Sequence, residues 1–212
     1  SKKAINILDK LKYLDEILLE PLGITLKYLF IADICTWMNN NDESIKYYAK
    51  LIDMHPNDDW YAFAYVNLAN SLIFAQKYDK ALETLKEVEL LIEKSPDNSH
   101  ISIKYLIEFN KTLIFIKNKD IENAYLCISQ MKNMDKHINA DYVKYEYLLS
   151  CLYFCLNDID NGFKWYYKQV EIDNKPCFNI IKDRWCNNAR KDNRYIDLLK
   201  EMKLYEYWKD SL

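Results

Sequence analysis

Glycine and proline are scarce in this chain of 212 residues. There are two glycines, Gly23 and Gly162, and four prolines. So few glycines exclude a glycine-rich phosphate-binding loop and leave few of the tight turns that β-hairpins require. Half of the residues are apolar, which is ample material for a buried core. The composition therefore favours an all-α fold.

The sequence has neither a basic surplus nor a long apolar run. Lys and Arg number 29 against 32 Asp and Glu, a formal net charge of -3. The chain thus lacks the attraction of a basic domain for nucleic acid or an anionic membrane, and we expect it to bind neither. No apolar stretch approaches the ~18 residues that cross a bilayer, and residues 1–12 lack the apolar region typical of a signal peptide. We expect a cytoplasmic location, and Ser1 in place of Met is consistent with a fragment of a longer protein.

Catalytic and metal-binding patterns are also lacking. The six cysteines lie mostly within apolar helical stretches, as buried thiols do in a reducing compartment. Cys151 and Cys155 are one helical turn apart, but no second pair or histidine at suitable spacing completes a four-ligand metal site. The three histidines stand alone in connecting segments, and no nucleophile sits in a recognisable motif. We expect no enzymatic activity, no metal and no cofactor.

Apolar residues recur at intervals of three and four along most of the chain, the period of amphipathic helices. A first helix is predicted over residues 4–19, ended by Pro21 and Gly23. Eight more helices are predicted as four pairs: 24–38 with 42–54, 59–76 with 79–94, 99–117 with 121–134, and 140–156 with 159–172.

Each predicted pair carries two small residues twelve positions apart: Ala32 and Ser44, Ala69 and Ala81, Thr112 and Ala124, and Ser150 and Gly162. Small side chains are needed where two antiparallel helices cross, because larger ones would hold the backbones beyond the roughly 8 to 10 Å at which helices pack. The spacing therefore indicates a helix-turn-helix repeat.

Larger residues recur around these small ones. The first repeat reads Tyr28, Ile31-Ala32, Cys35, Ser44, Tyr48, Leu51 and Pro56, and the second reads Tyr65, Leu68-Ala69, Leu72, Tyr78, Ala81, Leu85 and Val88. This pattern resembles the tetratricopeptide repeat. The resemblance implies a right-handed α-solenoid of about four helix pairs that binds a protein or peptide. We expect an N-terminal helix that is a cap or half repeat (1–22), four repeats (23–174) and a C-terminal helical cap (175–212).

The tail after Pro176 has a different pattern, with Asp183-Arg184-Trp185 and Asn193-Arg194-Tyr195 followed by Leu198-Leu199 and Met202. It resembles the C-terminal segment of repeat arrays in bacterial signalling proteins, such as winged-helix and AraC-type transcription regulators and adenylate cyclases. The resemblance implies the sensory or interaction part of a bacterial regulator. All three arginines lie in this tail. They form either an anion site or, with the neighbouring aspartates, an ordinary cap surface.

Superposing the repeats predicts a concave groove lined by the first helix of each pair. The candidate ligand-binding residues are Asp33, Trp37, Phe63, Asn67, Asn70, Phe74, Phe109, Lys144 and Tyr147. An extended peptide would lay side chains on this face while the two asparagines hydrogen-bond its backbone, a role that the family resemblance also implies. Alternatively, a short array packs these residues onto its own helices. The basic residues that clamp a C-terminal carboxylate in chaperone-binding members are missing apart from Lys144, which argues against such a ligand.

Two further roles stay open. The first is a peptide-pheromone receptor domain that follows a DNA-binding domain in a transcription regulator. The second is a homodimer or assembly scaffold, suggested by the unpaired helix 4–19 and by the aromatic residues Tyr205, Tyr207 and Trp208.

Overall fold

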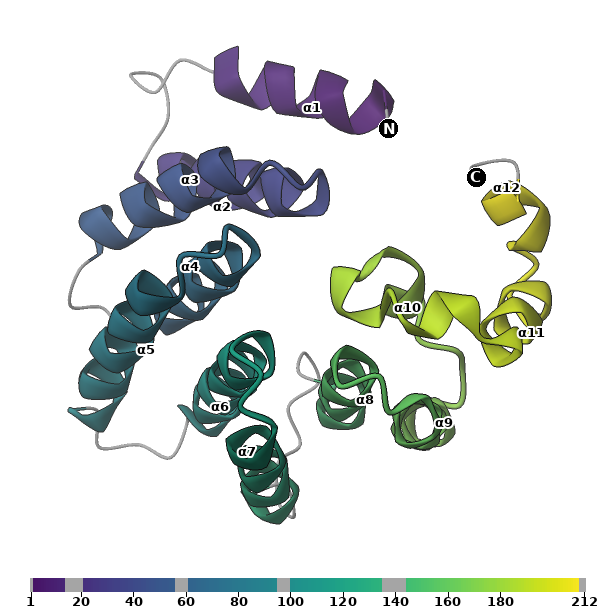
Figure 1. The fold of residues 1–212 in the computed structure, drawn as a ribbon. Helices are drawn as coiled ribbons and strands as arrows, with labels where there is room; N and C mark the ends of the chain where they lie inside the picture. Colours follow the sequence, from purple (N-terminus) through teal and green to yellow (C-terminus); the bar gives the residue numbers. More distant parts are fainter. Residues whose placement is uncertain (1, 14–20, 56–60, 95–99, 135–143, 210–212) are drawn as a thin grey trace. The chain divides into compact units, whose positions relative to one another are not determined.

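The computed structural model describes residues 2–13, 21–55, 61–94, 100–134 and 144–209, and the regular structure in these ranges is helical (Figure 1). In chain order the elements are α1 (Lys2–Tyr13), α2 (Pro21–Trp37), α3 (Asn41–Met54), α4 (Ala62–Phe74), α5 (Tyr78–Glu93), α6 (Ile101–Lys117), α7 (Ile121–Met134), α8 (Tyr145–Cys155), α9 (Ile159–Asp173), α10 (Asn179–Lys182), η5 (Arg184–Cys186), η6 (Ala189–Lys191), α11 (Asn193–Glu201) and α12 (Tyr205–Lys209). The predicted all-α class, built from successive helix pairs, is confirmed.

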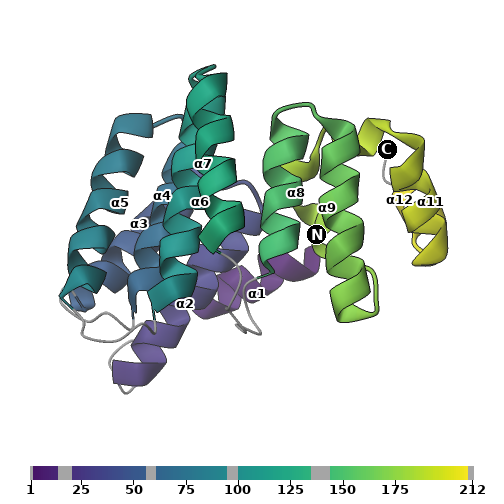
Figure 2. The ribbon, with the colours of Figure 1, turned by 90° about the horizontal axis from the view of Figure 1, so that it is seen from below.

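The chain divides into two compact units, Ser1–Lys111 and Thr112–Leu212, with the boundary inside α6. In the first unit α1 packs on α2, α2 along α3, and α4 along both α3 and α5. In the second unit α8 lies along α9, as Figures 1 and 2 both show. The division into an N-terminal helix, repeats and a cap at residues 22 and 174 stays a prediction.

Helix α2 begins earlier than predicted, at Pro21 instead of residue 24. Proline suits the first position of a helix, because its fixed φ is helical and its missing N–H would have no partner there. Pro21 therefore opens a helix, whereas we expected it only to end one. The predicted stretches 14–19 and 140–143 lie outside the described residues.

The small residues lie at the helix crossings, as their spacing predicts. Ala32, Ala69, Ala81 and Ala124 are fully buried. Gly162 shows why size matters, because a Cβ atom at this position would lie 2.3 Å from two ring carbons of Phe154.

Hydroxyl groups of the buried Ser44 and Ser71 and the half-buried Thr36 join three helices of the first unit. Ser44 Oγ on α3 lies 2.6 Å from Thr36 Oγ1 on α2 and 2.8 Å from Ser71 Oγ on α4. Thr36 and Ser71 each also donate to a backbone carbonyl one turn earlier in their own helix, on Ala32 and Asn67 respectively. The polar atoms at this crossing are therefore satisfied within the core, as burial requires.

The four turns inside the helix pairs share one backbone conformation. Asn39, Gln76, Lys119 and Asn157 occupy equivalent positions with φ between 59° and 62°. After each of them the next N–H donates to a carbonyl five residues back, for example Lys77 N to Leu72 O at 2.9 Å. This is the Schellman ending of a helix, which normally favours glycine in the left-handed position. All four pair turns adopt it without a glycine, and so does the end of α11, where Lys203 has φ 58° and Leu204 N donates to Leu199 O at 2.8 Å.

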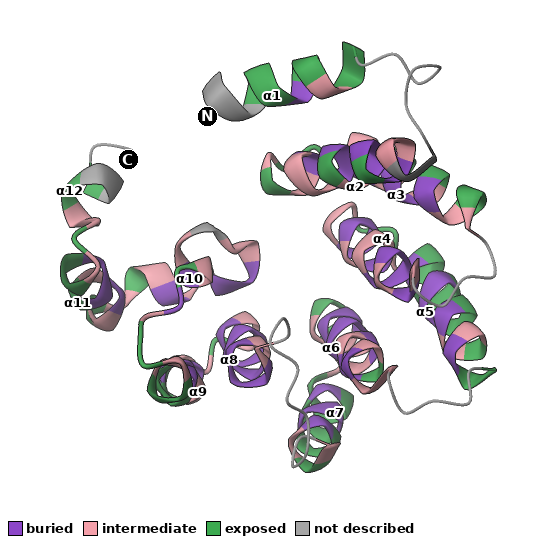
Figure 3. Ribbon diagram, turned by 180° about the vertical axis from the view of Figure 1, so that it is seen from behind, coloured by how far each residue is buried: buried purple, intermediate pink, exposed green. Residues whose placement is uncertain are grey.

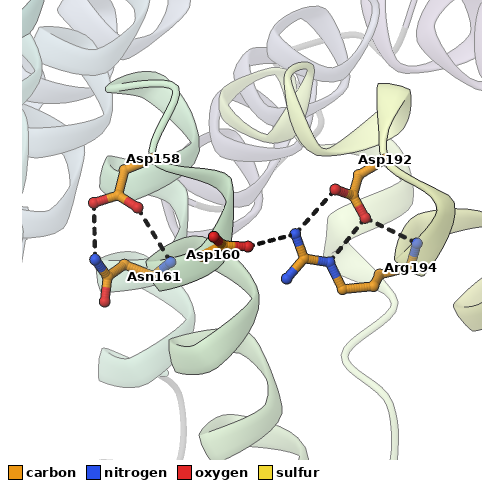
Figure 4. Close-up of polar contacts among 5 residues, drawn as sticks. All are labelled: Asp158, Asp160, Asn161, Asp192 and Arg194. Carbon is orange, nitrogen blue, oxygen red and sulfur yellow. Dashed lines mark hydrogen bonds and ion pairs between the residues drawn. The ribbon is translucent and has the colours of Figure 1, made fainter.

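Hydrogen bonds and ion pairs of Arg194 link the C-terminal segment to α9 (Figure 4). The Arg194 side chain donates to both carboxylate oxygens of Asp192 and, at 2.9 Å, to Asp160 at the start of α9. Its guanidinium also lies 4.6 Å from the centre of the Phe163 ring. Nearby, Asp158 caps α9 by accepting from the backbone and side-chain nitrogens of Asn161.

Arg190 is held by backbone groups, since its Nη2 donates to the carbonyl of Ile181 at 2.8 Å. Arg190 and Arg194 are thus engaged by the chain itself, and Arg184 also has an interaction partner within it. This arrangement favours the cap interpretation over an anion site.

Candidate functional site

Helix α2 exposes an apolar stripe on the side away from its core contacts. Leu26, Phe30 and Trp37 are 41%, 52% and 67% exposed. Their spacing of four and seven residues places them on one helix face. On the opposite side, Ile31, Ala32 and Cys35 are fully buried. We call Leu26, Phe30, Asp33 and Trp37 the α2 stripe.

Helix α4 has an equivalent face, thirty-seven residues further along the chain. Phe63, Asn67, Asn70 and Phe74 correspond in turn to the members of the α2 stripe, and all four are half-buried. We call them the α4 stripe. Phe63 packs partly against the core that α2 and α3 share. The two stripes combine aromatic side chains with three polar ones, which suits recognition of a peptide by side-chain and backbone contacts.

Asp33 is the acidic member of the α2 stripe. The hydroxyl of Tyr48 on α3 donates a hydrogen bond to its carboxylate. Burial raises the pKa of Asp33, and the hydrogen bond from Tyr48 partly opposes that rise. The pKa of Tyr48 is also raised, first by burial and then by the charge of Asp33. The phenol therefore stays protonated and holds the carboxylate in place.

The two predicted asparagines have different surroundings. Asn70 Nδ2 donates to Asn110 Oδ1 on α6 at 3.1 Å, and Asn110 in turn donates to the carbonyls of Val66 and Leu106. Asn70 therefore joins α4 to α6. Within the described part of the chain, the side-chain amide of Asn67 has no hydrogen-bond partner, so it is the better placed of the two to meet a peptide backbone.

Three other predicted groove residues are engaged by the chain itself. Phe109 lies on α6 and is buried. Lys144 forms an ion pair with Asp173 at the end of α9. Tyr147 on α8 is buried, and its hydroxyl donates to Asp183 Oδ2 at 3.1 Å. Phe109 and Tyr147, which we expected to line the groove, are thus buried, as in the alternative in which the array packs these residues onto its own helices.

The segment 183–188 covers the face of α8 that Tyr147 belongs to. Cys186 Sγ lies 3.5 Å from Cys151 Sγ, and Cys155 Sγ donates to the carbonyl of Trp185. Asn188 Nδ2 donates to the carbonyl of Phe154 at 2.8 Å. Helix α8 is accordingly buried over most of its surface, whereas α5 and α9 keep exposed outer faces (Figure 3). In the second unit the expected binding face is filled by the chain's own tail.

Sequence reasoning missed Leu26 and Phe30 and missed the role of segment 183–188. Leu26 and Phe30 could have been found from the sequence, because they lie two turns and one turn before Asp33 on the same helix face. The covering of α8 has no signal of this kind, because it joins a helix to segment 183–188, which lies 30 or more residues later and has no α-helical period.

The described residues hold no group of side chains suited to binding a metal ion. No three of their His, Cys, Asp and Glu side chains come together as metal ligands. The six cysteines are free thiols, as expected. His55 stacks on Tyr61 with ring centres 3.9 Å apart and contacts Thr25 Oγ1, whereas His137 lies outside the described residues.

None of the described helices has the length and apolar character that crossing a membrane requires.

Comparison with known proteins agrees with the repeat geometry. No curated protein matches the chain. A family model described as tetratricopeptide repeat matches residues 24–89, which span α2 to most of α5. Members of this family are in general protein-interaction modules and are typically non-catalytic. Residues 24–89 of the chain therefore carry the tetratricopeptide repeat motif.

Proposed function

We propose that the chain binds a peptide, or an extended segment of a protein, along the α2 and α4 stripes. The observation that carries the proposal is the exposure of Leu26, Phe30 and Trp37 on one face of a helix whose other side is buried. Exposed aliphatic and aromatic side chains in a contiguous stripe favour association with a partner over exposure to water. The amide of Asn67 lies on the equivalent face of α4 and would pair with the backbone of the ligand.

The second unit supports the same location indirectly. Its equivalent face on α8 already holds an irregular segment, 183–188, which makes hydrogen bonds to side chains and carbonyls of that helix. A segment of this chain can therefore occupy the inner face of a first helix. We infer that the ligand occupies α2 and α4 in a similar way, because Phe30 and Trp37 are 52% and 67% exposed.

Selection of random twelve-residue peptides on the immobilised chain tests this proposal. A selected peptide should lose about tenfold in affinity for Phe30→Ala and for Trp37→Ala, since truncating an aromatic side chain at the centre of an interface costs about 1 to 2 kcal/mol. Leu90→Ala is the matched control, because Leu90 is equally exposed (51%) but lies on α5. Affinity that is unchanged by the two aromatic variants would place the ligand elsewhere and refute the proposal.

The finer proposal is that this binding module serves a bacterial regulator in the cytoplasm. It rests on the resemblance of the tail after Pro176 to that of regulatory repeat arrays and on the six free thiols. A peptide-pheromone receptor is the alternative within this class. The sequence of the complete gene discriminates between them, because a DNA-binding domain encoded upstream favours the receptor and a cyclase or other signalling domain favours the broader role.

Self-association is the second candidate, and exposed residues on α1 favour it. Ile5, Ile7 and Tyr13 are exposed while Leu8 packs against the core of α2. Light scattering coupled to size exclusion, over a hundredfold range of concentration, tests it. A constant monomer mass excludes it.

A further inference from the structure

Asp33 is placed between two exposed aromatic side chains. Phe30 precedes it by three residues and Trp37 follows it by four, so the three side chains lie on one face of α2. A carboxylate flanked by aromatic rings is the complement of a guanidinium, which forms an ion pair and also stacks against ring faces.

Several of the described aspartates are paired with a Lys or Arg side chain. Asp42 is paired with Lys77, Asp173 with Lys144, and Asp160 and Asp192 with Arg194. Within the described part of the chain no Lys or Arg is paired with Asp33, whose hydrogen-bond donor is the Tyr48 hydroxyl. A carboxylate has about four acceptor sites, so the bond from Tyr48 leaves room for two guanidinium N–H groups.

The tail offers an internal example of the same chemistry. Arg194 lies over the Phe163 ring at 4.6 Å while its nitrogens bind two aspartates. A guanidinium thus stacks on an aromatic ring and pairs with carboxylates at once in this fold. On α2 the ring and the carboxylate are present and the guanidinium would come from the ligand.

We propose that the α2 stripe recognises an arginine side chain of the bound peptide, with apolar residues on either side of it. The carboxylate of Asp33 accepts the guanidinium, Phe30 and Trp37 flank it, and Leu26 contacts a neighbouring apolar residue. This inference rests on the proposed function, and it specifies the chemistry of the ligand at one position.

The test uses a selected arginine-containing peptide and the same peptide with arginine replaced by citrulline, which keeps the shape and removes the charge. We expect arginine to be enriched among selected peptides. The citrulline peptide should bind the unmodified chain about tenfold more weakly, because a hydrogen bond to a charged group is involved. Asp33→Asn should weaken the arginine peptide to a similar degree and remove the difference between the two peptides.

Asp53→Asn is the matched control, since Asp53 is an exposed aspartate on α3 of the same unit; it should leave both affinities unchanged. The citrulline peptide keeps the result interpretable even if Asp33→Asn disturbs the fold. Equal affinity of the two peptides for the unmodified chain overturns the arginine inference. Sensitivity to Phe30→Ala and Trp37→Ala in that case leaves the proposed function standing, whereas insensitivity to both defeats the proposed function itself.

Discussion

Glycine substitutions in the helix-pair turns should stabilise this protein. Gln76 and Lys119 both have left-handed backbone conformations, at φ 59° and 62°, and both are exposed. A residue with a Cβ is destabilised by about 1 to 2 kcal/mol in this region. Glycine avoids that cost. It also has more conformational freedom in the unfolded chain, which reduces the gain in folding free energy by about 0.5 to 1 kcal/mol. The net expectation is a gain of about 0.5 to 1 kcal/mol for Gln76→Gly and for Lys119→Gly.

Asparagine tolerates the left-handed region better than glutamine or lysine does. The gain from Asn39→Gly and Asn157→Gly should therefore be smaller. Urea unfolding followed by circular dichroism measures these differences, and thermal midpoints should rise by about 2 to 4 °C per kcal/mol at this chain length. Lys80→Gly is the control, because Lys80 is exposed inside α5 and should lose about 1 kcal/mol. A loss of stability for Gln76→Gly comparable to that of Lys80→Gly would refute this reasoning.

Three other outcomes are expected. Gly162→Ala should destabilise the second unit by about 1 to 3 kcal/mol in urea unfolding, because its methyl group would overlap the buried Phe154 ring; an unchanged midpoint would mean that the ring moves freely. Thiol titration at pH 8 should proceed slowly in the folded chain and quickly in urea, since burial raises the pKa of Cys155 to about 12; rapid modification of the folded chain would contradict the packing. Arg194 lowers the pKa of Asp192 by its side-chain hydrogen bonds, so their pairing should stabilise the fold at neutral pH and lose that effect as the pH falls below about 4. Asp192→Asn should therefore flatten the dependence of unfolding free energy on pH in this range. An unaltered pH dependence would show that the pair contributes nothing.

The repeat architecture was predictable because it is set by local and periodic features. Within each pair, the small residues at the crossing and the periodic apolar residues lie within 40 residues of one another. The match to the family model covers the first two of these pairs. The start of α2 at Pro21 was missed because proline both ends and begins helices.

The candidate site was predictable only in part, because exposure depends on contacts between distant segments. Asp33 and Trp37 follow from the repeat pattern. The burial of Tyr147 does not, since it depends on Asp183, a residue whose neighbours show no helical period. The partner of Asn70 is Asn110 on the next pair, and two asparagines forty residues apart give no signal that they meet.

The covering of α8 by segment 183–188 restricts how this array can lengthen in evolution. Repeat proteins grow by duplication of a helix pair, and each new pair must pack against the exposed face of the pair before it. A pair inserted directly after α9 would break the hydrogen bonds that the Tyr166 hydroxyl makes with the backbone N–H and carbonyl of Cys177. It would also separate the tail from Tyr147 and Cys151 on α8. A pair inserted ahead of α8 would leave all of these bonds intact. Variation in repeat number among relatives of this chain should therefore be found on the N-terminal side of α8.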